Sequence, residues 1–326
     1  MLILNAQDVK TTVPMKEAIE AMKKAYASLS NKTAVAPQRI HLSIPNHEAI
    51  SLFMPAYMKN ESEEALAIKV VSLFPKNPSR GLAYIQAAVL VLETDTGRAI
   101  ALLEGSTLTA IRTGAGSGAA IDLLARKDSK VLAIFGAGPQ GKTQLEAACA
   151  VRNIEKVFIY NPTKEKSEIF AKEMSGINAN INLANTPKEA IENADIICTA
   201  TGSKQAVFED KDVKPGTHIS AIGAYTPEMQ ELPIETVARS KIVVDSFETV
   251  MSEAGDIVKA LKAGLISEKD IHAELGEIVL GKKIGRETET EITFFKSVGN
   301  AVQDAVAAQV ALKNAKAMKI GQEIEF

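Results

Sequence analysis

The feature that most constrains this 326-residue chain is the hexapeptide GAGPQG at residues 136–141, which fits the pattern G-x-G-x-x-G. The apolar run VLAIF precedes it and the helix-like stretch QLEAACAV follows it. The pattern is weak by itself, but between a strand and a helix it predicts a dinucleotide-binding loop. A plain strand–turn–helix without a ligand is the alternative.

Each residue of this loop has an expected task. Gly136 permits the tight turn, Gly138 lets the backbone approach a pyrophosphate, and Gly141 lets helix and strand pack closely. Pro139 and Gln140 complete the loop, and the free N–H groups at the helix start face the anion. We therefore expect all five residues to contact a dinucleotide.

Strands and helices alternate from residue 130 onward. This alternation predicts right-handed βαβ units and a doubly wound parallel sheet of the Rossmann type. The expected strands are VLAIF, VFIY, NINL, DIICTAT, THISAIG and KIVVDS. The chain is therefore expected to belong to the α/β class.

The first 105 residues have a different pattern. Residues 14–29 have helical spacing, and the stretches after them are rich in β-branched residues, which predicts a helix followed by a mostly antiparallel sheet. Pro37, Pro45 and Pro55 separate apolar stretches, so we expect short strands joined by turns there. Residues 106–126 predict one helix or two, in which Gly114 allows close packing. The residues after about 300 predict one long helix.

Composition excludes several classes of protein. Apolar residues make up 46% of the chain, and the net charge is 37 − 40 = −3, which is not the charge of a dedicated nucleic-acid binder. No apolar run reaches the roughly 18 residues that span a bilayer. The start, MLILNAQDVK, does not resemble a signal peptide. Cys149 and Cys198 lack the spacing of a disulfide framework or zinc site. These features predict a cytoplasmic protein without nucleic-acid, membrane or metal partners.

The residues after the second expected strand bear on the choice of cofactor. An Asp or Glu there would bind the adenosine ribose and favour NAD. This chain has Asn161, which is neutral and does not repel a 2′-phosphate, followed by Thr163 and Lys164, which could bind one. This segment contains no Arg, which would be the usual partner of a 2′-phosphate. Thr163 could also simply cap a helix. The sequence slightly favours NADP, with NADPH and NADH both open.

Three cations of the first 115 residues lie in short or apolar segments: Arg39, Lys69 and Arg112. A charge in a strand usually points to solvent. Lys69, however, is enclosed in the apolar segment AIKVV, where a cation needs an anionic partner or a perturbed pKa.

Together, several stretches resemble the ornithine cyclodeaminase/μ-crystallin family in the family's own order, over essentially the whole chain. They are PQR (37–39), KVVSLFP (69–75), LTAIRTGAGSGAA (108–120), GAGPQG (136–141), TAT (199–201), GAYTPEMQEL (223–232) and FFKSVGNAVQD (294–304). The resemblance implies a discontinuous α+β substrate-binding and dimerisation domain, residues 1–115 and 300–326. The dinucleotide-binding domain would be residues 116–299, and the protein a homodimer.

The resemblance also implies roles for individual residues. Arg39, Lys69 and Arg112 match positions that grip a substrate carboxylate, with Lys69 beside the reacting nitrogen and Arg112 near the cofactor as well. Glu48 would line the pocket mouth, and Asp304 would begin the last helix facing that site. Further positions match cofactor contacts: Thr113, Thr199, Ala200, Thr201, Gly223, Ser297 and Gly299.

One departure from the family narrows the reaction. Relatives that deaminate ornithine or alanine carry an acid/base Asp in a G-x-D-x-P loop, where this chain has Gly223–Pro227 with Tyr225 at the third position. A phenol with a pKa near about 10 is a poor base at neutral pH. Tyr225 could act on the substrate or wall the pocket, and a packing role is equally consistent with its type. The change favours reduction of a ready-made cyclic imine.

The resulting hypothesis is NAD(P)H-dependent reduction of a cyclic ketimine carboxylate, most simply Δ1-pyrroline-2-carboxylate to L-proline, or its six-membered homologue. Lys69 is the expected proton donor, because burial and a neighbouring Arg would lower its pKa toward neutrality. The alternatives are an alanine dehydrogenase, an ornithine cyclodeaminase, or a non-catalytic NADP-dependent binding protein of μ-crystallin type. The presence of Arg39, Lys69 and Arg112 together argues against the last.

Overall fold

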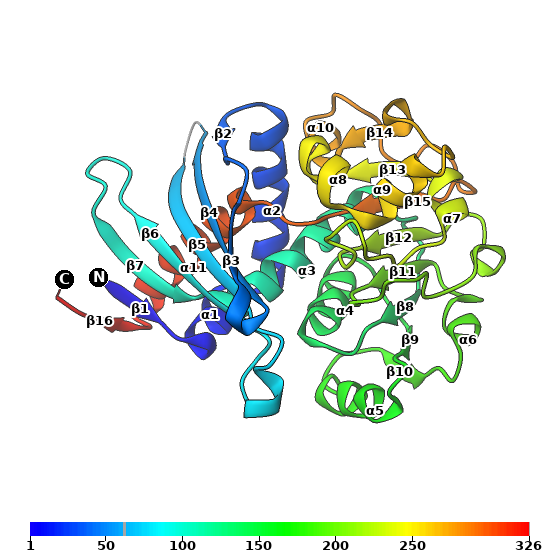
Figure 1. Cartoon of the computed structure of the whole chain (residues 1–326), viewed down its shortest axis with the longest axis horizontal. Helices are drawn as coiled ribbons and strands as arrows, with labels where there is room; N and C mark the ends of the chain where they lie inside the picture. The colour runs from blue at the N-terminus through cyan, green and yellow to red at the C-terminus, as the bar shows by residue number, and fades with distance from the viewer. Residues whose placement is uncertain (61–62, 326) are drawn as a thin grey trace. The chain divides into compact units, whose positions relative to one another are not determined.

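The computed structural model describes residues 1–60 and 63–325. The chain forms two compact units, Met1–Arg112 with Asn300–Phe326, and Thr113–Gly299. The chain passes from one unit to the other inside helix α3 (Gly105–Leu124) and again at residues 299–300. The first unit is therefore assembled from the two ends of the chain (Figure 1).

The first unit contains a mixed sheet in the order β16-β1-β7-β6-β5-β4-β2, with β3 paired to β4. Strands β3 to β7 pair with antiparallel neighbours, as the sequence predicts, whereas β1 runs parallel to β7. The strands are β1 (Leu2–Leu4), β2 (Ala34–Val35), β3 (Ile40–Ile44), β4 (Ala49–Lys59), β5 (Glu64–Leu73), β6 (Ile85–Leu92), β7 (Ala99–Glu104) and β16 (Gln322–Glu323).

The helices of this unit pack on one face of its sheet. Helix α11 lies against β4, β5 and β6, while α2 lies against β4 and α1 against β7 (Figure 1). The residues after 300 form the expected single long helix. The helical segments are α1 (Ala6–Thr12), α2 (Met15–Ser30), α11 (Ala301–Met318) and the short η1 (Pro45–His47) and η2 (Pro78–Arg80).

The expectation of short strands around Pro55 is wrong, because β4 runs unbroken through this proline for 11 residues. On one side β4 pairs with β5 throughout. On its other side β4 pairs with β3 only as far as Phe53, and with β2 only at Tyr57 and Met58. Proline lacks an N–H and is tolerated where no ladder hydrogen bond is required of it. Pro55 occupies the gap between the two partner strands.

The second unit contains a parallel sheet in the order β10-β9-β8-β11-β12-β15-β13-β14. This confirms the doubly wound α/β prediction, although the sequence had not indicated β14 or β15. The order reverses between β8 and β11, the position at which such sheets bind ligands. The strands are β8 (Val131–Phe135), β9 (Lys156–Tyr160), β10 (Asn180–Leu183), β11 (Ile196–Thr199), β12 (His218–Ala221), β13 (Lys241–Val244), β14 (Ile271–Glu274) and β15 (Thr293–Lys296).

Helices cover both faces of this second sheet, which explains the continuous apolar run in β8. Leu132 and Ile134 enter the core under α3, α4 and α5, while Ala133 and Phe135 enter the core under α6 to α9. The helical segments are α4 (Pro139–Val151), α5 (Lys164–Glu173), α6 (Pro187–Ile191), α7 (Ile234–Ala238), α8 (Phe247–Glu253), α9 (Gly255–Lys262), α10 (Leu275–Val279), η3 (Asp210–Asp212) and η4 (Glu268–Asp270).

Of the one or two helices expected over residues 106–126, the structure contains one, α3. A Cβ at Gly114 would lie 2.5 Å from the carbonyl oxygen of Thr143, so this glycine lets α3 pack closely against α4. No helix in the described part of the chain is both long and apolar enough to cross a membrane.

Candidate active site

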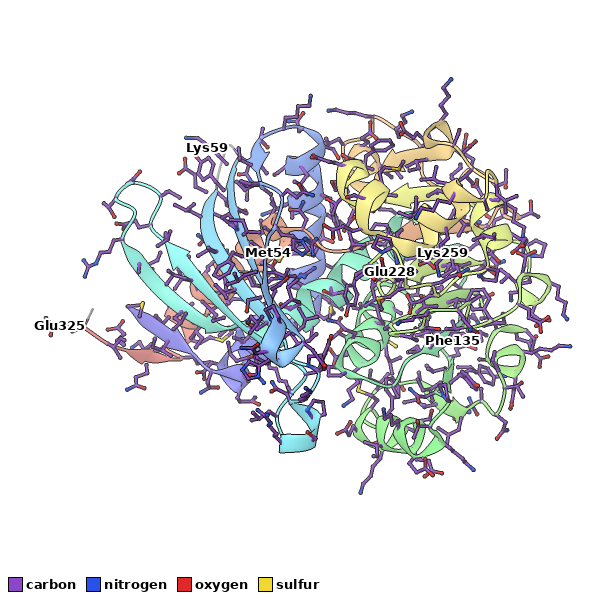
Figure 2. All side chains as sticks on the ribbon, viewed as in Figure 1. Met54, Lys59, Phe135, Glu228, Lys259 and Glu325 are labelled. Carbon is purple, nitrogen blue, oxygen red and sulfur yellow. The ribbon has the colours of Figure 1, made fainter. Side chains whose placement is uncertain are left out.

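In the first unit, a buried ion pair joins β5 to α11. Side chains alternate along β5, so Lys69 points to the helix-covered face with Ala67 and Val71. Its partner on β4 is Met54, which Figure 2 labels. The side chain of Lys69 is 2% exposed, and its Nζ lies 2.7 Å from Oδ2 of Asp304 in the first turn of α11. Lys69 therefore has the anionic partner that its apolar surroundings require.

The guanidinium of Arg112 belongs to the same cluster. Its Nε donates to Oδ1 of Asp304 at 2.9 Å, and its Nη1 donates to Oε1 of Gln303 at 3.1 Å. Gln303 in turn donates from Nε2 to the hydroxyl of buried Tyr26 at 2.7 Å. Asn300 caps α11 and donates its backbone N–H to Gln303. The start of α11 thus presents two polar side chains to the two cations.

Gln303 and Tyr26 were not identified as site residues from the sequence. A signal was available for Gln303, because Asn300 and Gln303 have the spacing of a capping box that begins a helix. Tyr26 carried no such signal, since it falls on the apolar side of a helical pattern like any core residue.

The surroundings of Lys69 lower its pKa to about 7. Burial contributes most, because it disfavours the ammonium form, and the charges of Arg112 and Arg39 act in the same direction. The carboxylate of Asp304 opposes them and raises the pKa. At neutral pH the side chain is therefore divided between its ammonium and amine forms.

Arg39 and Glu48 lie on either side of β3. Arg39 is half-buried directly before the strand, and its charge acts on Lys69. Glu48 ends η1 with φ +53°, its side chain is 71% exposed, and its carboxylate lies 3.4 Å from Nζ of Lys76. The structure gives Glu48 a surface ion pair and does not place it in the Lys69 cluster.

In the second unit, the GAGPQG loop joins β8 to α4, with Gly138 at the N-cap and Pro139 as the first helical residue. Gly136 has φ +102°, and a Cβ there would lie 2.4 Å from the carbonyl oxygen of Ala200. A Cβ at Gly141 would lie 2.0 Å from the carbonyl oxygen of Gly136. A Cβ at Gly138 would meet no atom of the described residues within 4 Å, so open space lies in front of this glycine.

A cavity of about 790 Å³ opens at the carboxyl ends of β8, β9 and β11. Its walls include residues of the glycine loop, of the segments that follow β9 and β11, and of the first turn of α5: Gly136, Gly138, Asn161, Ala200, Thr201 and Lys166. Thr163 and Lys164 are not among the lining residues. The side chain of Asn161 accepts a hydrogen bond from the backbone N–H of Thr163 at 2.9 Å. The cationic residue that lines the cavity is Lys166 rather than Lys164.

The remaining expected cofactor residues lie at the same carboxyl edge of the sheet or on α3. The hydroxyl of buried Thr199 donates to Glu231, and the carbonyl of Gly223 accepts from Lys296. The segment Ser297–Gly299 is held by Asp245, which accepts from the Ser297 hydroxyl at 2.7 Å and from the N–H of Gly299 at 2.9 Å.

Thr113 and Tyr225 differ in their surroundings. Thr113 is half-buried in α3, directly after Arg112. Tyr225 follows Ala224, which has φ +48°, and its side chain is 37% exposed. Tyr225 is thus not a core residue, and a catalytic role for it stays a prediction.

In the glycine loop, Oε1 of Gln140 is buried without a hydrogen-bond partner among the described residues.

The parallel sheet, the glycine loop and the cavity at the point of strand reversal define a dinucleotide-binding type of α/β protein, coupled here to a unit with a buried Lys–Asp–Arg cluster. More specifically, the chain belongs to the ornithine cyclodeaminase/mu-crystallin family, whose model matches residues 1–319.

Known proteins resemble this chain over its full length. A Delta(1)-pyrroline-2-carboxylate reductase of Bacillus cereus is 41% identical, with 100% of both chains covered. The structure of Thermococcus litoralis Delta(1)-pyrroline-2-carboxylate reductase with NADH and L-proline is 43% identical, with a TM-score of 0.95 over 99% of this chain and 100% of that chain. An archaeal alanine dehydrogenase dimer with bound NAD is 33% identical, with a TM-score of 0.92 over 100% and 99%.

Proposed function

We propose that this protein is an NAD(P)H-dependent reductase of a cyclic ketimine carboxylate, with Δ1-pyrroline-2-carboxylate as substrate and L-proline as product. The observation that carries the proposal is the buried Lys69, whose pKa is lowered to about 7 beside Asp304 and Arg112. The names of the B. cereus and T. litoralis relatives support the choice of substrate.

The proposed reaction places a hydride on the imine carbon and a proton on the ring nitrogen. An imine accepts hydride poorly until its nitrogen is protonated, so an acid is required beside the nitrogen. Lys69 fits this task, because a proton donor works best with a pKa near the operating pH. Asp304 stabilises the ammonium before the transfer, and solvent protons restore the ammonium afterwards.

The same cluster suits a substrate that carries a carboxylate. Arg39 and Arg112 bring two positive charges to the environment of Lys69. A guanidinium binds a carboxylate with charge-assisted, often bidentate hydrogen bonds. The substrate carboxylate would partly neutralise these charges and raise the pKa of Lys69, which favours the ammonium when the imine is bound.

The cavity of the second unit fits a dinucleotide. The open space at Gly138, the start of α4 and the volume of about 790 Å³ suit a pyrophosphate with its ribose. When bound there, a reduced nicotinamide cofactor supplies the hydride. Asn161 carries no negative charge, and Lys166 could pair with a 2′-phosphate, so both NADH and NADPH fit. The slight preference for NADP stays a prediction, since the two similar structures hold NADH and NAD.

We also propose that the protein forms a homodimer through the sheet of its first unit. The face opposite the helices is apolar across six strands, as the register shows: Val35 and Tyr57, Ile40 and Phe53, Ile68 and Leu90, Leu90 and Leu102. Val35 and Ile40 are 60% and 62% exposed. Contiguous apolar surface of this kind marks interaction sites, and the archaeal relative is a dimer. The cytoplasmic location stays a prediction.

The first experiment mixes the purified protein with NADH or NADPH and Δ1-pyrroline-2-carboxylate. Loss of the reduced-nicotinamide absorbance together with L-proline formation is expected for the wild type. The Lys69→Met variant should bind the cofactor but leave it unoxidised. If the wild type oxidises neither cofactor, this substrate is wrong, and alanine, ornithine and the six-membered imine are tested next. If the protein turns over none of these compounds, the alternative of a non-catalytic ligand-binding protein is favoured.

A further inference from the structure

A second buried charge cluster lies in the second unit and takes no part in the reaction proposed above. It consists of Glu231, Asp256 and Lys296, each with 0% of its surface exposed. Removing charges from water is costly, and a buried ion pair often stabilises a fold no better than apolar packing of the same size. Overall stability alone therefore does not account for this cluster.

Lys296 and Asp256 hold the backbone around the cluster in place. Lys296 is the last residue of β15, and its Nζ contacts Oδ2 of Asp256 at 3.0 Å and donates to the carbonyl of Gly223. Asp256, in the first turn of α9, accepts at Oδ1 from the backbone N–H of Glu231 at 2.7 Å and of Leu232 at 3.0 Å. The backbone that carries Glu231 is thus fixed by Asp256, and Lys296 in turn holds the Asp256 carboxylate.

The carboxylate of Glu231 holds the wall of the cavity. Its Oε2 accepts from the hydroxyl of Thr199 at 2.8 Å, and its Oε1 accepts from the backbone N–H of Thr201 at 2.6 Å. Thr201 lines the cavity, whereas Glu231 does not. The packing behind this wall is tight, because a Cβ at Gly223 would lie 2.5 Å from Cδ of Glu231 and 2.4 Å from the carbonyl oxygen of Thr201.

We propose that Glu231 is a positioning residue of the dinucleotide site, whose ionised carboxylate holds Thr199–Thr201 in the conformation that binds the cofactor. The inference rests on the proposed function in one respect, namely that a dinucleotide occupies the cavity. Glu231 acts through Thr201 and the end of β11 rather than by touching the ligand.

The charges that face Glu231 make this arrangement sensitive to pH. Burial and the charge of Asp256 on α9 raise the pKa of Glu231, while Lys296 on β15 and the hydrogen bonds from Thr199 and Thr201 lower it, and the result is about 7. Below this pH the carboxyl is protonated and loses its charge-assisted hydrogen bonds, which are roughly twice as strong as neutral ones. Dinucleotide affinity is therefore expected to fall as the pH falls.

The test is a fluorescence titration of the whole protein with NADH, without substrate, for the wild type, Glu231→Gln and a control, Glu228→Gln. Glu228 is an exposed residue of the same loop (Figure 2). The loss of charge in Glu231→Gln is expected to raise the Kd for NADH about fivefold, and the control should bind like the wild type. From about pH 8 to pH 6, the wild-type Kd should rise toward that of Glu231→Gln, whose own Kd should stay constant.

Equal NADH affinity and an equal pH slope in the wild type and Glu231→Gln would overturn the proposal. Thr199→Val, which removes one of the two donors to the same carboxylate, gives an independent test should Glu231→Gln not fold. Its Kd is expected to rise about threefold, and wild-type affinity would count against the role of Glu231. A wild type that binds neither NADH nor NADPH would refute the proposed function itself, and the two failures are thus distinguishable.

Discussion

Replacement of Asp304 by Asn tests the origin of the unusual Lys69 pKa. The Asp304 carboxylate lies 2.7 Å from Nζ of Lys69 and raises a pKa that burial and two arginines lower. A hydrogen bond to a charged group contributes about 1.5–3 kcal/mol, and 1.36 kcal/mol corresponds to one pKa unit. Removing the charge should therefore lower the pKa of Lys69 by about one to two units, from about 7 to between about 5 and 6.

The assay is the pH dependence of kcat/KM for imine reduction, followed by the absorbance of the reduced nicotinamide. The donor must be protonated, so kcat/KM should fall as the pH rises through the pKa of Lys69. The wild-type midpoint is expected near pH 7. In Asp304→Asn the midpoint should lie about one to two pH units lower, and activity at pH 7, where half of the wild-type Lys69 is protonated, should fall about 5- to 50-fold.

Two controls accompany this experiment. Asn retains an amide oxygen that can accept from Nε of Arg112, and thermal unfolding will show whether the variant keeps its fold. Glu20→Gln removes an exposed carboxylate from α2 in the same unit and should leave the midpoint unchanged. An unshifted midpoint in Asp304→Asn, or a shift to higher pH, would refute this account of Lys69.

Five further substitutions test single residues. Lys69→Met should abolish turnover and leave NADH binding largely intact; equal turnover would remove Lys69 from the mechanism. Arg39→Ala should raise the KM for the imine about 10- to 100-fold, because a charge-assisted bond is lost; an unchanged KM would place the substrate carboxylate elsewhere. Tyr225→Asp should introduce measurable alanine or ornithine deamination, and its absence would show that this residue alone does not set the reaction. Gly138→Ala should fold normally but bind NADH more weakly, whereas Gly141→Ala should lower the free energy of unfolding by about 1–3 kcal/mol, since its Cβ would collide with the backbone; both are checked by titration and thermal melting.

Local features could be predicted because they depend on residues close together in the sequence. The run VLAIF, the loop GAGPQG and the helical stretch after them specify β8, its turn and α4. The alternation of strands and helices predicts the parallel sheet because of the handedness of βαβ units. The interpretation failed at Pro55, where the pairing of a strand depends on partners that local sequence does not reveal.

Among the expected cofactor residues, too, some positions follow from local sequence and others depend on tertiary packing. Asn161 follows β9 directly, and its place at the cavity follows from strand order. Which lysine of α5 reaches the cavity depends on the rotation of the helix, and the structure places Lys166 there instead of Lys164.

The sequence by itself determined the dinucleotide-type sheet and the glycine loop, and it identified three cations as candidate site residues. Tertiary structure alone decided that Lys69 meets Asp304, and that Arg112 meets the same carboxylate from 192 positions away. It also brought Glu231, Asp256 and Lys296 together behind the cavity. The physical reason is that burial and charge–charge distance set a pKa, and both arise only when segments far apart in the chain pack against one another.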